Sequence, residues 1–332
     1  MMNDELKDTS KFKAWISAMR LRTLPLSFSV ILMGNAIAAV YPIIIVSPTS
    51  EEPLGPLLNW KIFTLTLITT LFLQVLSNFA NDYGDALKGA DDENRIGPTR
   101  AIQSGVLSAK EMLIGIVITS ILCLISGIWL LIVAFGTDLS LSFALFLIFG
   151  ILAIAAAIKY TVGKGAYGYF ALGDLFVFLF FGILGVVGSF YLQEKTFDWI
   201  VLFPASMIGL LSVAVLNLNN MRDAINDKKV GKKTMAVLLG FEKSKKYHLV
   251  LFILAWGPFL IVNGLLAYFD LKYGLFILLG YGPFLTIHIL HLTKVFRFED
   301  RKQYDPELKK IALSTFGIAL VTFVSVILFH AN

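Results

Sequence analysis

The chain has 332 residues, of which 57% are hydrophobic and 15% are charged, whereas a soluble domain carries about 25% charged residues. This composition excludes an ordinary soluble enzyme and predicts a membrane protein with a single domain over residues 1–332. The net charge of +5 could indicate nucleic-acid binding, but the basic residues are spread over short loops, so we expect no nucleic-acid partner. The single cysteine, Cys123, excludes an intrachain disulfide and is expected to be buried.

The first twenty residues are polar and lack the short apolar core of a cleaved signal peptide, so residues 1–20 are interpreted as a cytoplasmic arm. Nine apolar windows follow, each of about twenty residues and long enough to cross the hydrocarbon as a helix. The predicted spans are residues 24–46, 62–80, 112–135, 139–158, 167–192, 199–221, 248–269, 273–292 and 311–330. The predicted fold is therefore an all-α, polytopic membrane protein with nine transmembrane helices.

The distribution of basic residues predicts the orientation of these spans. With the N-terminus inside, 25 of the 28 Lys and Arg residues fall in cytoplasmic segments. Lys and Arg concentrate on the cytoplasmic side of membrane proteins, so we expect a cytoplasmic N-terminus. Two acid-rich segments, 81–110 and 221–246, then lie on the same face and are the expected active-site loops.

The first acid-rich segment follows the second predicted span. Asn81 and Asp85 are four residues apart, so on a helix they share one face. Asp91 follows a break at Gly89 and can fold back over the same ion, and the neighbouring carboxylates are expected to be supporting residues. Carboxylates at the mouth of a membrane protein are costly unless a cation uses them, which favours a metal site.

The second acid-rich segment follows the sixth predicted span and is organised in the same way. Asp223 and Asp227 are four residues apart, about 6 Å along a helix axis, and Asn220 lies one turn before Asp223. Mg2+ prefers such oxygen ligands and is usually held by one or two carboxylates together with substrate phosphates. One acid of this kind would indicate only a polar helix end, but two matched clusters on one face predict a shared Mg2+–diphosphate site.

The two segments also indicate an internal repeat. They are four spans apart, and because four is even, the two halves have the same orientation. We therefore expect two four-helix halves in parallel repeat around a central cavity, with the ninth helix added.

Basic and aromatic residues near the acids are candidate substrate ligands. Arginine suits phosphate oxygens through its planar guanidinium, and lysine acts as a point charge. The candidates are Arg22, Arg100, Lys159, Tyr160, Arg222 and Lys228. Membrane topology alone would account for most of the lysines, and Lys159 would by default extend from its helix end toward water.

Two further features lie inside predicted spans. Asp174 is the only formal charge in the fifth span, which makes it a candidate functional group, although pairing with Lys159 or Lys164 would serve packing alone. His288 and His291 are three residues apart in the eighth span. Without a third ligand nearby in the sequence, we expect an interfacial role for them rather than a metal site.

These residues carry a resemblance to a known family. The chain resembles the UbiA superfamily of intramembrane prenyltransferases over nearly its whole length. The two acidic motifs of that family stand here as residues 81–85 with Asp91, and as residues 223–227. Longer matching runs are LRTLPLS (21–27), NDYGDALKGADDENRIGPTRAIQSG (81–105), YTVGKGAYGYFALGD (160–174), FFG (180–182) and NNMRDAINDKKVGKKTMAVLLG (219–240). The third acid of the first motif stands at Asp91 rather than at the position of Gly89. In this respect the chain is similar to the branch of the family that prenylates 1,4-dihydroxy-2-naphthoate in menaquinone biosynthesis.

The resemblance implies transfer of a polyprenyl chain from polyprenyl diphosphate to 1,4-dihydroxy-2-naphthoate, a bicyclic aromatic acid. Carbon dioxide and diphosphate would leave, giving demethylmenaquinone. The implied location is the bacterial cytoplasmic membrane, with the site opening to the cytoplasm. Two alternatives stay open: another aromatic acceptor, such as 4-hydroxybenzoate or homogentisate, and a cation-coupled transporter in which the acids bind ions and no bond is made.

The resemblance also implies roles for individual residues. Mg2+ would bridge the diphosphate to both acidic motifs. Arg100, Lys159 and Arg222 would hold the diphosphate, and Arg22 would bind the carboxylate of the aromatic acid. Asp91 and Asp174 are the candidate bases.

Overall fold

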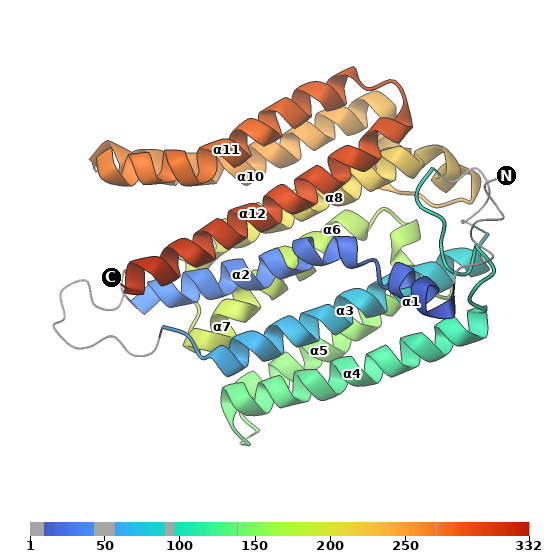
Figure 1. Ribbon diagram of the computed structural model, residues 1–332, viewed down its shortest axis with the longest axis horizontal. Coiled ribbons are helices and arrows are strands. Elements are labelled where there is room, and N and C mark those ends of the chain that lie inside the picture. Colours follow the sequence, from blue (N-terminus) through green and yellow to red (C-terminus); the bar gives the residue numbers. More distant parts are fainter. Residues whose placement is uncertain (1–9, 43–56, 90–95, 138, 270, 332) are drawn as a thin grey trace. The chain divides into compact units, whose positions relative to one another are not determined.

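A computed structural model describes residues 10–42, 57–89, 96–137, 139–269 and 271–331, and within them the backbone is helical apart from turns and one isolated parallel bridge between Phe170 and Lys233 (Figure 1). The longer helices are α2 (Leu24–Tyr41), α3 (Trp60–Leu87), α4 (Ala109–Phe135), α5 (Leu141–Lys159), α8 (Leu202–Lys229), α10 (Phe241–Phe269), α11 (Leu271–Arg297) and α12 (Tyr304–Ala331). The shorter ones are α1 (Lys11–Met19), α6 (Gly173–Val177), α7 (Gly188–Glu194) and α9 (Met235–Leu239). Position 46, the predicted end of the first span, and Asp91 lie outside the described residues.

Seven segments of the described chain are long and apolar enough to cross a membrane. They are Lys11–Tyr41, Trp60–Leu87, Ala109–Phe135, Leu141–Lys159, Gly173–Glu194, Trp199–Lys229 and Arg301–Leu328. The protein is therefore an all-helical, polytopic membrane protein. Helices α10 and α11, which cover the seventh and eighth predicted windows, are not among these seven segments.

The fifth predicted span begins later than the hydropathy pattern suggested. Residues 160–172 form a loop between α5 and α6, here called the α5–α6 loop, and the helix starts only at Gly173. Gly163, Gly165 and Ala171 adopt positive φ angles of 81°, 71° and 58°. A right-handed helix cannot continue through such residues, so the apolar window is broken at its start. Residues 178–187 then form a π-helical stretch before α7.

The chain divides into two compact units, and both acidic motifs belong to the first. Unit 1 consists of Met1–Leu24, Thr64–Asp174 and Asn219–Phe241. Unit 2 consists of Pro25–Phe63, Leu175–Leu218 and Glu242–Asn332. Segments far apart in sequence are thus brought into one unit, which is what a site built from both motifs requires.

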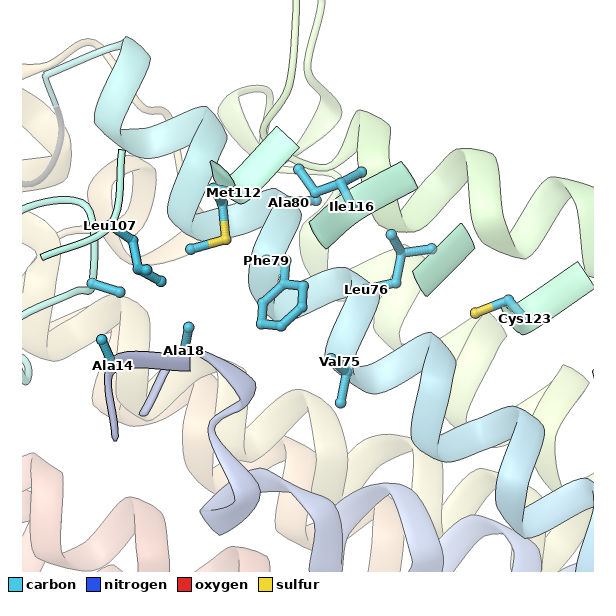
Figure 2. Close-up of a cluster of buried hydrophobic side chains, with 11 residues drawn as sticks. Ala14, Ala18, Val75, Leu76, Phe79, Ala80, Leu107, Met112, Ile116 and Cys123 are labelled. Carbon is cyan, nitrogen blue, oxygen red and sulfur yellow. The ribbon is translucent and has the colours of Figure 1, made fainter. Parts of the chain in front are cut away.

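The core of unit 1 joins α1, α3 and α4 (Figure 2). Phe79 lies in the middle of this cluster, and its ring meets the ring of Trp15 edge-on at 5.2 Å. Gly115 of α4 is required there, because a Cβ atom at that position would come within 2.7 Å of the Trp15 ring. Cys123 is buried in the same cluster, as expected. The predicted N-terminal arm therefore contains a helix that packs into the core.

Unit 2 contains a buried network of hydrogen bonds between α8, α10, α11 and α12. Asn217 Nδ2 lies 3.3 Å from His248 Nδ1, His248 Nε2 lies 2.9 Å from His291 Nε2, and His291 Nδ1 lies 2.7 Å from Glu307 Oε2. An amide nitrogen can only donate, so His248 Nδ1 must accept, and its Nε2–H then donates to His291. His291 in turn donates its Nδ1–H to Glu307. One set of tautomers is therefore consistent with every hydrogen bond in this series.

The ring nitrogens of His288 in this unit also have hydrogen-bond partners. Trp256 Nε1 donates to His288 Nδ1 at 2.9 Å, and His288 Nε2 lies 2.7 Å from Ser314 Oγ. His288 and His291 are both buried, so the interfacial role expected for them is corrected. Their side chains are members of a protein-internal network, which hydropathy could not reveal because their partners lie on other helices.

Candidate active site

The first acidic motif lies on the last turns of α3, which continues through Leu87. Asp82 and Asp85 are buried, and Asn81 is partly buried. A Cβ atom on Gly84 would come within 2.5 Å of Thr161 Oγ1, so glycine permits the α5–α6 loop to approach the motif closely. Thr161 Oγ1 donates to the carbonyl oxygen of Ala80 at 2.9 Å and to Asn81 Oδ1 at 3.3 Å. The loop is thereby fixed against the motif.

Asp85 is surrounded by hydrogen-bond donors and positive charge. Arg100 Nη2 lies 2.9 Å from Asp85 Oδ2, and the Tyr169 hydroxyl donates to Asp85 Oδ1 at 3.0 Å. Lys232 Nζ lies 3.9 Å from Asp85 Oδ2. Asp82 acts differently, because its Oδ2 accepts the backbone N–H of Ala101 at 3.2 Å. Asp82 therefore positions the segment that carries Arg100.

The second acidic motif lies on the last turns of α8. Asp223 accepts two hydrogen bonds from the Arg222 guanidinium, at 2.9 Å from Nε and 2.8 Å from Nη2. Arg222 Nη2 also donates to Asn219 Oδ1 at 2.7 Å. Asn220 and Asp227 are buried on the same stretch of helix. The spacing predicted from the sequence thus places these polar side chains together in a buried region of unit 1.

The chain reverses direction after α8, and this reversal places Lys232 between the two motifs. Gly231 has a φ of 73°, and Lys232 N donates to the carbonyl oxygen of Asp227 at 2.8 Å. The Lys232 ammonium lies 3.8 Å from Asp227 Oδ1 and 3.9 Å from Asp85 Oδ2. One acid of each motif therefore contacts the same buried cation.

The α5–α6 loop contributes two phenols to this region. Burial raises the pKa of Tyr160, and the charges of Asp85, Asp174 and Asp227 raise it further. Burial also raises the pKa of Tyr169, followed by the charge of Asp85. Both hydroxyls therefore remain protonated at neutral pH.

Contacts of Tyr169 connect the loop to both motifs. Lys88 Nζ lies 3.8 Å from the centre of the Tyr169 ring, in a cation–π arrangement. Burial lowers the pKa of Lys88, while the charge of Asp85 acts in the opposite direction. The carbonyl oxygen of Tyr169 accepts the backbone N–H of Lys233 at 3.2 Å, beside the bridge between Phe170 and Lys233.

Several predicted site residues are not part of this buried cluster. Arg22, Lys159 and Lys228 are exposed. Asp174 is buried in the first turn of α6 and acts electrostatically on Tyr160. Asp91, the predicted third acid of the first motif, lies outside the described residues.

Other members of the site were not predicted from the sequence. They are Arg20, Thr161, Tyr169 and Lys232. Gly231 ahead of Lys232, at the end of the motif helix, is a signal for a chain reversal that could have found the lysine. The glycines of the α5–α6 loop similarly indicate a compact turn. Arg20 carries no such signal; it ends α1 in a left-handed conformation with a φ of 49°, and its positive charge is one of several that act on Asp85.

The donor set fits a magnesium ion that is shared with a phosphorylated substrate. Among the described residues, no group of three or more His, Cys, Asp or Glu side chains forms a ready-made metal cage. Mg2+ commonly uses one or two carboxylates and completes its coordination with water and substrate phosphates. Buried amide and carboxylate oxygens on two helix ends, with basic side chains beside them, suit that arrangement.

Known prenyltransferases are similar to this chain over most of its length. The chain is 46% identical over 245 residues to a 1,4-dihydroxy-2-naphthoate octaprenyltransferase of Haemophilus influenzae, covering 74% of this chain and 75% of the relative. The enzyme of the same description from Escherichia coli K12 is 45% identical over 239 residues, covering 72% of each chain. A UbiA prenyltransferase domain-containing protein 1 homolog of Drosophila melanogaster is 29% identical and covers 94% of this chain and 79% of its own.

The fold also has a solved counterpart. A structure of digeranylgeranylglyceryl phosphate synthase aligns with a TM-score of 0.54 and 19% identity, over 96% of this chain and 99% of that one. The family profile described as UbiA prenyltransferase family matches residues 54–328. Since this match spans most of the chain and the bacterial relatives exceed 30% identity, the chain belongs to the UbiA prenyltransferase family.

Proposed function

We propose that the protein transfers a polyprenyl chain from polyprenyl diphosphate to 1,4-dihydroxy-2-naphthoate, with loss of carbon dioxide and diphosphate. The observation that carries this proposal is the contact of Lys232 with Asp85 and Asp227, which joins the two acidic motifs in one buried, ion-paired site. The acceptor follows from the naphthoate prenyltransferases of 45% and 46% identity.

Enzymes of the UbiA family generally use Mg2+. The residues that would hold it are Asn81, Asp85, Asn220, Asp223 and Asp227, with Asp91 as a further candidate from the segment that is not described. Bound Mg2+ neutralises the diphosphate and makes it a better leaving group.

The chain's own basic residues would bind the diphosphate oxygens. Arg100, Arg222 and Lys232 are buried or nearly so, and each already contacts an acid of the motifs. When the C–O bond breaks, its electron pair stays on the diphosphate, and these cations stabilise the added charge. Exposed Arg22, Lys159 and Lys228 are assigned to attracting the anionic substrates, with Arg22 directed to the aromatic carboxylate.

The transfer step balances without an added proton acceptor. The ring carbon that bears the carboxylate attacks the allylic cation, and a new C–C bond forms. The bond to the carboxylate then breaks, its electron pair restores the aromatic ring, and carbon dioxide leaves. A base is needed only to polarise a ring hydroxyl, and we assign this role to Asp174, with Tyr160 beside it, or to Asp91. Exclusion of water protects the cation from hydrolysis.

We also infer the finer topology from the sequence. Nine crossings in one domain, with α10 and α11 included, place the N-terminus and both acidic motifs on the cytoplasmic side. This is supported by the 25 of 28 basic residues that the arrangement puts inside. Two parallel halves around a central cavity remain part of the proposal, as does the location in a bacterial cytoplasmic membrane.

An acceptor assay tests the proposal. Membranes containing the protein are incubated with a polyprenyl diphosphate, Mg2+ and one aromatic acid at a time, and diphosphate and prenylated product are measured. We expect turnover with 1,4-dihydroxy-2-naphthoate. Turnover only with 4-hydroxybenzoate or homogentisate would reassign the acceptor, and ion uptake without any prenylated product would indicate a transporter instead.

A further inference from the structure

Lys232 is held in place between one acid of each motif. Its backbone N–H is bonded to Asp227 O at 2.8 Å, and its ammonium lies within 4 Å of carboxylate oxygens of both Asp85 and Asp227. The side chain is 11% exposed, so solvent screens these contacts little. The turn at Gly231 sets the backbone position from which this side chain reaches both acids.

The carboxylates that would hold the metal therefore already have counter-ions from the protein. Asp85 has Arg100 on Oδ2 and the Tyr169 hydroxyl on Oδ1. Asp223 has the Arg222 guanidinium on both oxygens. A metal ion at these oxygens would lie within a few ångströms of positive charge unless the basic side chains move away from it.

Such a displacement has a cost that depends on the diphosphate. A buried cation without a partner is strongly unfavourable. A bare metal ion that takes Asp85 and Asp227 weakens the attraction of these two acids for Arg100 and Lys232 and puts a further positive charge beside them. A metal ion that arrives with a diphosphate supplies new anionic oxygens for the same two side chains. Metal and diphosphate should therefore strengthen each other's binding, and by the same factor in both directions.

We infer that Lys232, together with Arg100, is an exchangeable counter-ion that pairs with the acidic motifs in the free enzyme and with the diphosphate in the complex. The exchange makes the metal and the diphosphate bind cooperatively, with weak binding of the metal alone. This inference rests on the proposed function for the identity of the anion. It assigns to Lys232 a substrate-binding role that couples the two ligands.

The test compares Lys232→Gln with Lys233→Gln in purified protein in detergent micelles. Lys233 is the exposed neighbour, so this control removes the same charge from the same turn. Mn2+ serves as the probe metal and inorganic pyrophosphate as the probe anion, and bound Mn2+ is measured by electron paramagnetic resonance, corrected for metal–pyrophosphate complexes in solution. Melting temperatures establish that each variant is folded.

In Lys232→Gln we expect the affinity for the metal alone and the affinity for pyrophosphate to change in opposite directions. Affinity for Mn2+ alone should rise by about 10-fold, the scale of effects reported for residues that contact metal ligands. Affinity for pyrophosphate in the presence of Mn2+ should fall by about 10-fold or more. The factor by which each ligand strengthens binding of the other should therefore fall toward 1. Lys232→Arg should keep weak binding of the metal alone, and Lys233→Gln should match the wild type within about 2-fold.

Loss of both affinities in Lys232→Gln, or no change in either, would overturn the inference, because a lysine with a purely structural role cannot strengthen one ligand while weakening the other. The outcome is separate from that of the acceptor assay. Opposite shifts without prenyl transfer to any acceptor would leave the counter-ion exchange standing and refute the acceptor assignment. Prenyl transfer without opposite shifts would leave the proposed function standing and refute the exchange.

Discussion

Units 1 and 2 each bury a polar network, and the two networks differ in charge. In unit 1, carboxylates face guanidinium and ammonium groups, as in the pairs of Asp85 with Arg100 and Asp223 with Arg222. In unit 2, the interior of the network consists of amide, imidazole and indole groups, as at Asn217, His248 and Trp256. Formal charges enter it at Glu307, whose basic partners are the partly buried Lys310 and the exposed Lys294.

This difference in charge indicates that the two networks have different roles, one in binding and catalysis and one in stabilising the fold. Buried ion pairs are an expensive way to stabilise a fold, since desolvation often exceeds the attraction, and they are enriched where the charges take part in binding or catalysis. A network made mostly of neutral donors and acceptors holds helices together without that cost. We therefore assign a chemical role to the network of unit 1. The network of unit 2 has a structural role, which is to hold its own helices together.

The largest expected effect is that of Asp85→Asn. Removing this carboxylate takes away the buried acid that Arg100 and Lys232 share, which should destabilise the protein by about 3–5 kcal/mol. Prenyl transfer should fall by at least about 100-fold, because a proposed metal ligand is lost. Melting temperature and turnover of the purified protein measure the two effects.

A second substitution separates these effects. Asp85→Asn combined with Arg100→Gln removes both charges, so much of the stability should return while activity stays absent. Contacting residues are expected to be non-additive in this way. A double variant as unstable as the single one would show that the pair is not energetically coupled. A double variant that regains activity would remove Asp85 and Arg100 from the site.

In unit 2, His291→Leu should reduce stability and leave turnover per folded molecule near the wild-type value. The substitution leaves the His248 donor and one Glu307 oxygen without their partner, at about 1–3 kcal/mol for each buried group. Thr293→Ala on the same helix is the control, since Thr293 is exposed and should change stability by less than about 0.5 kcal/mol. A large loss of turnover with normal stability would contradict the supporting role of this network.

Gly84→Ala should have an intermediate effect, confined to unit 1. The new methyl group would lie 2.5 Å from Thr161 Oγ1, so the α5–α6 loop must shift, at about 1–3 kcal/mol. Gly150→Ala is the matched control in α5, where a Cβ atom meets nothing within 4 Å. That substitution should stabilise the helix by up to about 1 kcal/mol. Equal effects at the two positions in thermal unfolding would show that the contact is not tight.

The smallest effect is expected from Tyr169→Phe, and its pH dependence is the useful observation. The raised pKa of Tyr169 means that its hydroxyl supports the folded state fully below about pH 10, the ordinary value for tyrosine. That support is lost as the pH rises toward the folded-state value. The melting-temperature difference between wild type and variant should thus be constant from pH 6 to 9 and shrink above about pH 10. A difference that changes between pH 6 and 9 would contradict a protonated Tyr169.

The sequence predicted what depends on neighbours within one helix. The spacing of Asn81 with Asp85 and of Asp223 with Asp227 is local, so the acidic motifs were identified without the fold. The hydropathy windows located the long helices for the same reason. Contacts made by a chain reversal were not predictable in this way, and Lys232 and Tyr169 reach Asp85 only through such turns.

The roles predicted for Arg22, Lys159 and Lys228 stay predictions, and the structure shows that all three side chains are exposed. Arg20, which ends α1 in a left-handed conformation, is one of the positive charges that act on Asp85. Hydropathy and spacing do not report such a conformation, and nearness to a motif along the chain does not predict burial beside its acids.

Helix α1 has a practical consequence for expression and truncation of this protein. The carbonyl oxygen of Met19, at the end of α1, accepts a hydrogen bond from Asn78 Nδ2 at 2.9 Å, one turn before Asp82 on α3. A chain shortened to begin at the first long apolar helix would lose this bond and the Trp15 side chain that packs on Phe79. Such a shortened protein should insert into membranes yet yield a poorly active preparation, so purification tags belong ahead of Ser10.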